Sequence, residues 1–264
     1  MPWCSMRRIT ASALRLFGVS SSLCLALIVQ PLTAEGQTPT QSAFQAQAQA
    51  AVSSGKLFST VNLTATAEWT AGSDKENGTA QLQAKADGST SVQLSLGKSS
   101  RTEVQAAATS SRSCTWADGA GTIHTILGPN CFIAVPWFAP GLFTQPSSQL
   151  PALLGTTDNG EVSKDNATFH QISYVLNLQG MDSASTTQLV SMSTVKVFYD
   201  PQTFLPASLE YQVHPDNNDL KNIPVKVVFS NYQPVSGVML PYHIEKYVNR
   251  TLQLSLDVNN ASIE

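Results

Sequence analysis

The alternation of apolar and polar residues in the last third of the chain is the feature that most constrains its fold. Between residues 205 and 213 every second residue is apolar, and the pattern returns at 238–244 and at 252–258. A period of two places the apolar residues on one face of a half-buried strand. Short polar turns separate these segments, so residues 195–263 predict an antiparallel meander with one buried and one solvent-facing side.

Earlier parts of the chain carry the same signal. Strands are predicted at 61–69, 79–86, 91–96, 101–104, 114–117, 122–127 and 169–178. The residues between them predict a polar loop at 72–78, with Asn77-Gly78 as its turn, and a second turn at Asp158-Asn-Gly160. Residues 147–155 predict a short capped helix. Residues 38–54, rich in Gln and Ala and followed by Gly55, predict either a first helix or a lead-in without fixed structure.

Three stretches of the last third resemble the lipoprotein-carrier superfamily, which includes the periplasmic lipoprotein carrier, its outer-membrane acceptor and related sensor domains. They are Val197-Phe-Tyr-Asp-Pro-Gln-Thr-Phe-Leu-Pro206, Val228-Phe-Ser-Asn-Tyr232 and Gly237-Val-Met-Leu-Pro241, followed by Asn260. The resemblance implies a mainly β (α+β) fold, in which a strongly curved antiparallel sheet forms an unclosed β-barrel with a few short helices on its concave side. Because a first helix precedes the first strand in this superfamily, the resemblance favours a helix at 38–54.

The first residues of the chain have the organisation of a targeting segment. Arg7, Arg8 and Arg15 form a basic start, an apolar run follows at 16–29, and Ala34 offers a small residue for cleavage. Residues 1–34 are therefore predicted to be a signal peptide, and residues 35–264 a single domain. The alternative is an uncleaved membrane anchor. With the resemblance, export implies a location in the periplasm or in association with the outer membrane.

Charge and cysteine content restrict the partners. Charged residues make up 12% of the chain, the net charge is −3, and no run of Lys or Arg occurs after the basic start. This pattern predicts no electrostatic binding to nucleic acid or to anionic lipid head groups. Cys4 and Cys24 lie in the predicted signal peptide, so Cys114 and Cys131 remain. In an oxidising compartment they favour one disulfide, worth roughly 3 kcal/mol, over two buried free thiols.

Residues 132–154 differ from the strands around them, because aromatic and apolar residues are interrupted by Pro136, Pro140 and Gly141. A strand does not tolerate these prolines. The segment is therefore interpreted as a lid over the concave face, as a loop that plugs the core, or as an exposed apolar patch. The residues predicted to line a ligand cavity are Trp69, Trp116, Trp137, Phe138, Leu142 and Phe143.

Motifs for catalysis, cofactor binding or metal binding do not occur in the sequence. The histidines His124, His170, His214 and His243 are far apart in the sequence, and no Cys or His spacing indicates a metal site. Arg101 and Arg112 are both candidates for the arginine that closes the carrier's lid. The sequence thus predicts a protein that is not an enzyme and needs no cofactor.

The favoured hypothesis is an exported protein that holds a lipid or an acylated protein by its acyl chain in an apolar cavity. The alternative is a sensing or interaction module whose cavity is filled by its own side chains and whose partner is another envelope protein. An unrecognised hydrolase is the third hypothesis.

Overall fold

The computed structural model describes residues 42–107, 112–127, 130–131, 136–146, 153–176, 190, 192–215, 217–218 and 220–264. The chain divides into two compact units, Met1–Gln37 and Thr38–Glu264, and all described residues belong to the second. The predicted signal peptide at 1–34 therefore lies outside the described residues. In the described part of the chain, no helix has both the length and the hydropathy needed to cross a bilayer.

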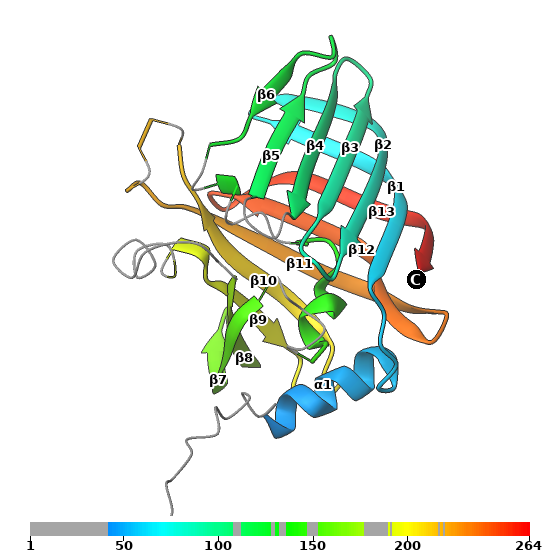
Figure 1. The fold of residues 1–264 in the computed structure, drawn as a ribbon, viewed down its shortest axis with the longest axis vertical. Helices are drawn as coiled ribbons and strands as arrows, with labels where there is room; N and C mark the ends of the chain where they lie inside the picture. The colour runs from blue at the N-terminus through cyan, green and yellow to red at the C-terminus, as the bar shows by residue number, and fades with distance from the viewer. Residues whose placement is uncertain are drawn as a thin grey trace, which may run out of the picture. The chain divides into compact units, whose positions relative to one another are not determined.

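One antiparallel sheet of thirteen strands dominates the fold (Figure 1). In chain order the elements are α1 (Ala43–Ser53), β1 (Thr60–Ala71), β2 (Asp74–Lys85), β3 (Thr90–Leu96), β4 (Ser100–Ala107), β5 (Arg112–Ala117), β6 (Ile123–Thr125), the 3-10 helix η1 (Pro140–Thr144), β7 (Leu153–Lys164), β8 (Ala167–Leu176), β9 (Val195–Tyr199), β10 (Pro206–Val213), β11 (Ile223–Val235), β12 (Val238–Val248) and β13 (Thr251–Ile263).

The sheet consists of two meanders that are joined by one pair of strands. Its strand order is β6-β5-β4-β3-β2-β1-β13-β12-β11-β10-β9-β8-β7, so β1 of the first meander pairs with β13, the last strand of the second. The terminal strands of this order, β6 and β7, do not pair with each other. The sheet therefore curves without closing (Figure 1). The predicted mainly β fold with an unclosed barrel is confirmed.

The helix α1 begins and ends at residues with clear capping roles. Ser42 and Gln45 form a capping box, in which each side-chain oxygen accepts a hydrogen bond of 3.2 Å from the other residue's backbone N–H. At the other end, Ser54 and Gly55 have φ of 52° and 79°, the left-handed conformation that terminates helices. Part of the predicted 38–54 segment is thus a helix.

A single apolar cluster joins α1, η1 and the inward-facing residues of the strands. The helix α1 contacts both η1 and β12, and η1 also contacts β10. Gly141 allows the close packing of η1, because a Cβ at this position would lie 3.0 Å from Cγ1 of Val52. These contacts place both helices on the side of the sheet that carries its buried side chains.

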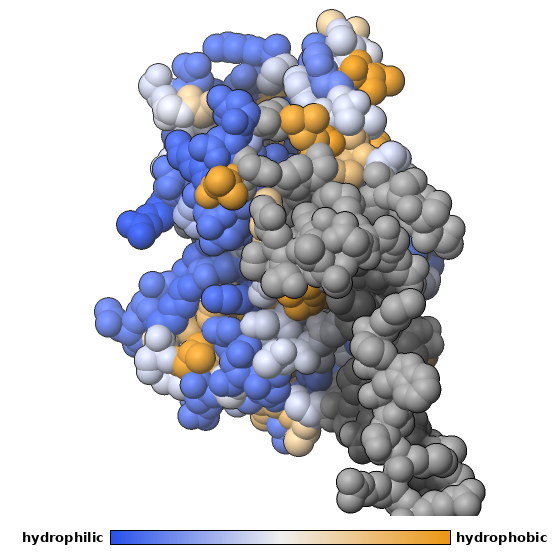
Figure 2. All heavy atoms as spheres, turned by 60° about the vertical axis from the view of Figure 1, so that its left-hand side comes forward, coloured by the Kyte–Doolittle hydropathy of each residue, from blue (hydrophilic) through white to orange (hydrophobic). Residues whose placement is uncertain are grey.

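Large apolar side chains on the surface are few. Those that are more than two-fifths exposed in the described part of the chain are Leu57, Val104, Ile123, Leu127 and Leu220. Among the coloured residues on the face in Figure 2 most are hydrophilic, and the apolar ones form small, separate groups. The exposed-patch interpretation of residues 132–154 is wrong for residues 137–145, because all of them are buried.

The polar loop predicted at 72–78 is wrong. Ala71 and Asp74 are paired in register, so the hairpin between β1 and β2 turns within Gly72 and Ser73. Gly78 instead lies inside β2, where a Cβ would come within 2.0 Å of the backbone oxygen of Ser95 in β3. The glycine that indicated a turn therefore serves the close approach of two strands.

The turn predicted at Asp158-Asn-Gly160 is also wrong, because these residues lie within β7. Asp158 is opposite Ile172 and Gly160 is opposite Gln171, which leaves Asn159 as the extra residue of a β-bulge. Gly160 has a φ of 72°, in the left-handed region, and this conformation occurs in β-bulges as well as in turns.

The hairpin between β7 and β8 reverses at Asp165-Asn166 instead. The φ angles of these two residues are 51° and 63°, as in a two-residue type I′ turn. The helix predicted at 147–155 is wrong for residues 153–155, which begin β7, and its other residues lie outside the described ones.

Candidate functional site

The six predicted cavity residues separate into two groups. Phe138, Leu142 and Phe143 are at most 2% exposed and belong to the core cluster. The ring of Phe143 lies 5.0 Å from that of Tyr174, so these side chains fill the space between η1 and the sheet. Within the described residues, this part of the 132–154 segment therefore plugs the core.

The three tryptophans of the predicted set line two adjoining pockets of about 320 and 270 Å³. Trp116 lines the larger pocket, Trp69 the smaller one, and Trp137 both. Six residues border both pockets: Val92, Arg101, Glu103, Trp137, Lys246 and Gln253. We call the two pockets together the tryptophan cleft.

One wall of the cleft carries polar side chains of β4. In the register of β3 and β4, Glu103 is opposite Val92, Arg101 opposite Leu94, and Gln105 opposite Thr90. Directly opposed residues share a face of the sheet. The three polar side chains therefore lie on the same face as the buried Val92 and Leu94. Inward-pointing charges near a sheet edge also hinder edge-to-edge association, so this placement has a structural use as well.

Arg101 connects this wall to the mouth of the cleft. Its Nε donates to Oε1 of Glu103 at 2.6 Å, and its guanidinium carbon lies 4.4 Å from the ring centroid of Trp116. Trp116 stacks on His124 in turn, with 4.1 Å between the ring centroids. The side chains of Arg101 and Glu103 are 41% and 37% exposed, so this cation–π arrangement is open to solvent.

Lys246 lies on the opposite wall, in β12. It is paired with Val227 of β11 and Leu254 of β13, both buried, and Leu254 is paired with Trp69. The Lys246 ammonium lies 4.5 Å from the ring centroid of Trp137. Burial lowers the pKa of Lys246; the nearby Glu103 carboxylate partly offsets this effect.

Among the described residues, the ammonium of Lys246 has no carboxylate within ion-pair distance. Four other lysine or arginine side chains and three histidines do form such pairs there. Lys246 is thus a partly buried cation whose contact in the described part of the chain is the face of one tryptophan.

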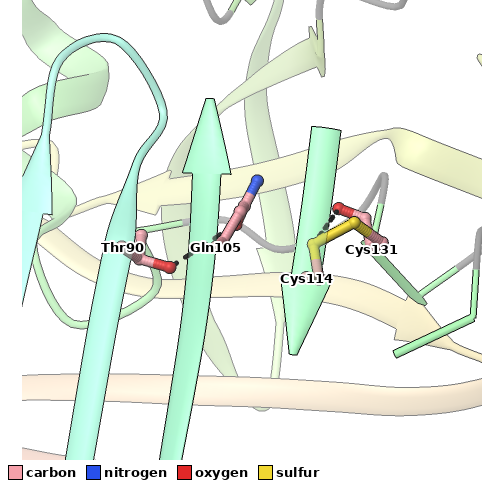
Figure 3. Close-up of a disulfide and its surroundings, with 4 residues drawn as sticks. All are labelled: Thr90, Gln105, Cys114 and Cys131. Carbon is pink, nitrogen blue, oxygen red and sulfur yellow. Dashed lines mark hydrogen bonds between the residues drawn. A yellow bond between two sulfur atoms is a disulfide. The ribbon is translucent and has the colours of Figure 1, made fainter. Parts of the chain in front are cut away.

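The predicted disulfide is confirmed (Figure 3), and its Cys114 lines the larger pocket of the cleft. Cys114 and Cys131 are bonded, with their Cα atoms 5.4 Å apart, which excludes the alternative of two free thiols. Gln105 of β4 is paired with Cys114 and is 3% exposed. Its Oε1 accepts a hydrogen bond of 3.4 Å from Thr90, and its Nε2 has no acceptor among the described residues.

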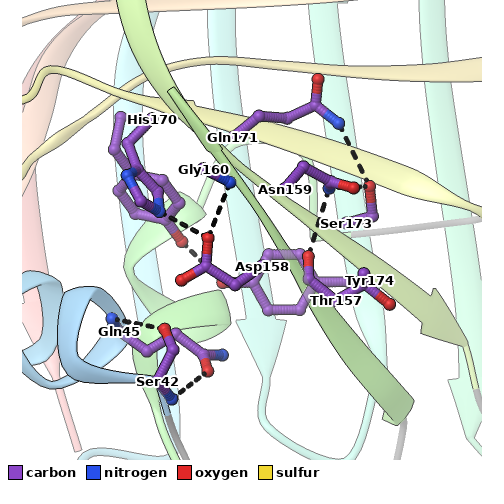
Figure 4. A network of polar contacts seen from close by, with 11 residues as sticks. Ser42, Gln45, Thr157, Asp158, Asn159, Gly160, His170, Gln171, Ser173 and Tyr174 are labelled. Atoms are coloured by element: carbon purple, nitrogen blue, oxygen red, sulfur yellow. Dashed lines mark hydrogen bonds and ion pairs between the residues drawn. The ribbon is translucent and has the colours of Figure 1, made fainter. Parts of the chain in front are cut away.

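A second polar network joins α1 to β7 and β8 (Figure 4). Nε2 of His170 lies 2.6 Å from Oδ1 of Asp158, which also accepts from the N–H of Gly160 at 2.9 Å. The His170 ring stacks on Phe44 at 3.5 Å. Burial alone would raise the pKa of Asp158, but hydrogen bonds from Ser42, Gly160 and His170 hold it below its usual value.

This network contains a serine, a histidine and an aspartate, but not in the order that nucleophilic catalysis requires. Among the hydrogen bonds of the described residues, Oγ of Ser42 accepts from the backbone N–H of Gln45 and Nε2 of His170 contacts Asp158, so the hydroxyl is not paired with the imidazole. An imidazole activates a serine only when it accepts the hydroxyl proton directly. The described geometry therefore does not favour the hydrolase hypothesis.

The histidines do not converge. His124 lies 3.7 Å from Asp118 and His243 2.7 Å from Asp257. The ring nitrogens of the buried His214 have no hydrogen-bond partner among the residues that the structure describes. Among the residues that the structure describes, no group of three His, Cys, Asp or Glu side chains is arranged to hold a metal ion.

Sequence reasoning missed Lys246, Glu103 and Gln105. A signal for Lys246 was present, because continuing the alternation of 238–244 by one step places it on the buried face of β12. Arg101, one of two candidates for a lid arginine, contacts Glu103 and Trp116 at the cleft. The side chain of the other candidate, Arg112, lies outside the described part of the structure.

Comparison with known proteins identifies the fold. No protein-family model and no curated protein sequence matches the chain. A DUF1329 family protein from Desulfovibrio piger is 10% identical, with a TM-score of 0.50 over 84% of this chain and 90% of that one. A putative outer membrane lipoprotein-sorting protein domain from Vibrio parahaemolyticus is 8% identical, with a TM-score of 0.49 over 84% and 91% of the two chains. A LolA superfamily protein from Nitrosomonas europaea is 10% identical, with a TM-score of 0.46 over 85% and 94%. At 10% identity, the likeness to the DUF1329 family protein shows a shared fold and no more.

Proposed function

We propose that this protein is an exported, non-enzymatic binding protein that holds the alkyl or acyl chain of a lipid in the tryptophan cleft. The observation that carries the proposal is the convergence of Trp69, Trp116 and Trp137 on one cleft from three distant parts of the chain. The chain has four tryptophans, and the fourth, Trp3, lies in the predicted signal peptide.

The cleft has the lining and the size for one alkyl chain. Between the tryptophans its walls carry buried aliphatic side chains, among them Val92, Leu94 and Leu254. Each methylene group removed from water contributes roughly 0.8 kcal/mol. Small-molecule sites usually have volumes of about 300–1,000 Å³, and the cleft is near the lower end of that range. In the superfamily that this chain resembles, the concave side of the sheet receives acyl chains. The ligand would be a lipid or an acylated protein in the periplasm or at the outer membrane.

A second candidate function is an interaction or sensing module whose partner is another envelope protein. The burial of Phe138, Leu142 and Phe143 favours it, because these side chains already fill part of the concave side. The two candidates differ in whether the remaining cleft takes a ligand.

Intrinsic fluorescence tests the first candidate directly, because every tryptophan after residue 34 lines the cleft. The protein is purified without detergent, its bound lipids are identified by native mass spectrometry and extraction, and dodecanoate is then titrated into it. We expect dodecanoate to change the fluorescence, and Trp137→Ser to bind it at least about tenfold more weakly, since the lost aromatic contact is worth more than about 1.4 kcal/mol.

Trp137→Phe is the matched control and should bind nearly as well as the unmodified protein, because it keeps a ring in the same place. A ligand-free mass together with no response to dodecanoate or phospholipids would contradict lipid binding. The second candidate function would then be tested by capture of partners from envelope extracts.

A further inference from the structure

Lys246 is the feature of the tryptophan cleft that binding of an uncharged alkyl chain does not explain. Its neighbours across the sheet, Val227 and Leu254, are 0% and 3% exposed, so it occupies an inward position of an otherwise apolar row. Placing an ammonium there costs free energy, because burial disfavours the charged form. A protein that needed only an apolar wall would gain stability from Leu or Met at this position.

The cleft carries one net positive charge. The charged residues that line its two pockets are Arg101, Glu103 and Lys246, two cations and one carboxylate. Glu103 is bound by Arg101 at 2.6 Å and also raises the pKa of Lys246, so a single carboxylate faces two cations. The remaining titratable residue of the lining is Tyr211, which is neutral because burial raises its pKa.

A second polar group of the cleft has no partner in the part of the chain that the structure describes. Nε2 of Gln105 is buried, finds no acceptor there and belongs to a residue that lines the same pocket as Lys246. An ammonium and an amide N–H are both donors. An ionised carboxylate or phosphodiester accepts hydrogen bonds and donates none. One such group could therefore accept from both the Lys246 ammonium and the Gln105 amide.

We propose that the amphiphile bound in the tryptophan cleft has a monoanionic head group, held by Lys246 with Gln105 beside it, and an alkyl chain that packs against the tryptophans and the aliphatic wall. This inference rests on the proposed function and adds the chemical class of the ligand. It differs from the composition-based prediction that anionic lipid head groups are not electrostatic partners. The chain as a whole is negative, whereas the one excess positive charge of the cleft lining is local.

The test compares ligands of one chain length and different head charge. Dodecanoate, dodecanol and dodecyltrimethylammonium are titrated into the protein below their micelle concentrations, and binding is followed by tryptophan fluorescence. Lyso-phosphatidylglycerol supplies a phosphodiester in place of a carboxylate, and acetate supplies a carboxylate without a chain. We expect both monoanionic lipids to bind about tenfold or more tightly than dodecanol, as a charge-assisted hydrogen bond would produce.

Two variants assign this preference to Lys246. Lys246→Met keeps the apolar stem and should bind dodecanoate and dodecanol equally well, whereas Lys246→Arg should retain the preference. The matched control is Lys226→Met: Lys226 lies between the buried Val225 and Val227 on the neighbouring strand, so it points to the opposite face, where it pairs with Asp165 at 2.6 Å. Raising the pH toward 10.5, the usual pKa of lysine, should weaken dodecanoate binding and leave dodecanol binding unchanged.

The outcomes separate this inference from the function on which it rests. Equal binding of dodecanoate and dodecanol to the unmodified protein overturns the anionic head group and leaves lipid binding in place. A preference that survives in Lys246→Met, with the variant folded by circular dichroism, also overturns it. Binding of acetate as tight as that of dodecanoate, or of no amphiphile at all, contradicts the proposed function itself.

Discussion

Lys246 shows how one residue can serve binding at the expense of stability. Its stem lies in a row of buried side chains, its ammonium rests on the face of Trp137, and burial lowers its pKa. Binding sites commonly contain groups of this kind, which the fold would be more stable without. The same side chain is therefore expected to affect ligand preference and folding stability in opposite directions.

Lys246→Met should therefore raise the free energy of unfolding, by about 1 kcal/mol, because it replaces a desolvated cation by an apolar side chain of similar length. Urea denaturation of the ligand-free protein measures this change. The control Lys226→Met should leave stability the same or slightly lower, because it removes an exposed ion pair. A clear loss of stability in Lys246→Met would show that the lysine is a structural residue.

At the scale of elements, the N-terminus of α1 is attached to the sheet by a few polar contacts. Ser42 caps the helix, Phe44 stacks on His170 of β8, and Nε2 of His170 contacts Asp158 of β7. The bulge at Asn159 places Asp158 and the N–H of Gly160 where these contacts meet. The bulge therefore has a structural role in holding the helix.

These contacts should make the attachment of α1 sensitive to acid. The pKa of Asp158 is lowered in the folded protein, so its contribution is complete above about 3.8, the usual value, and is lost as the pH falls through the lowered value. Asp158→Asn should be less stable than the unmodified protein by about 1 kcal/mol at pH 7 and equally stable at the acid end. Urea unfolding at a series of pH values measures the difference.

Asp74→Asn is the control for this series, because Asp74 is an exposed aspartate at the start of β2. It should show no such pH-dependent difference from the unmodified protein. A constant loss of stability in Asp158→Asn at every pH would contradict the electrostatic explanation.

At the scale of the whole domain, the two meanders depend on one core. Their only seam in the described sheet is the pairing of β1 with β13, and the apolar cluster includes residues from both meanders, from α1 and from η1. Phe138 is fully buried in that cluster and lies beside Trp137, with 5.3 Å between the ring centroids. Core and cleft are thus adjacent parts of one packed unit.

Phe138→Ala should lower the free energy of unfolding by about 3–5 kcal/mol, because it leaves a cavity in this shared core. Circular dichroism and tryptophan fluorescence should report the same transition, since both meanders lose support together. Leu220→Ala, at a position that is 78% exposed, should change stability by less than about 0.5 kcal/mol. Two separate transitions would show that the meanders fold independently.

Local patterns predicted the strands well and the turns less well. Alternation is a property of neighbouring residues, so the meander at the end of the chain was predictable from it. The disulfide was predicted from the cysteine count, and the helix after Ser42 only with the help of the family resemblance. Turn dipeptides failed at Asn77-Gly78 and at Asp158-Asn-Gly160. Glycine occurs in turns, in bulges and where two strands approach closely, so a glycine by itself does not indicate a turn.

The sequence by itself determined the mainly β fold, the buried faces of most strands and the disulfide. Only the tertiary structure decided which tryptophans share a cleft and which aromatic residues fill the core, because this depends on the pairing of β1 with β13 and on the curvature of the sheet. It also decided that Lys246 faces the cleft without a carboxylate partner. Contacts between strands that are distant in the chain arise from register and curvature, and no local pattern encodes either.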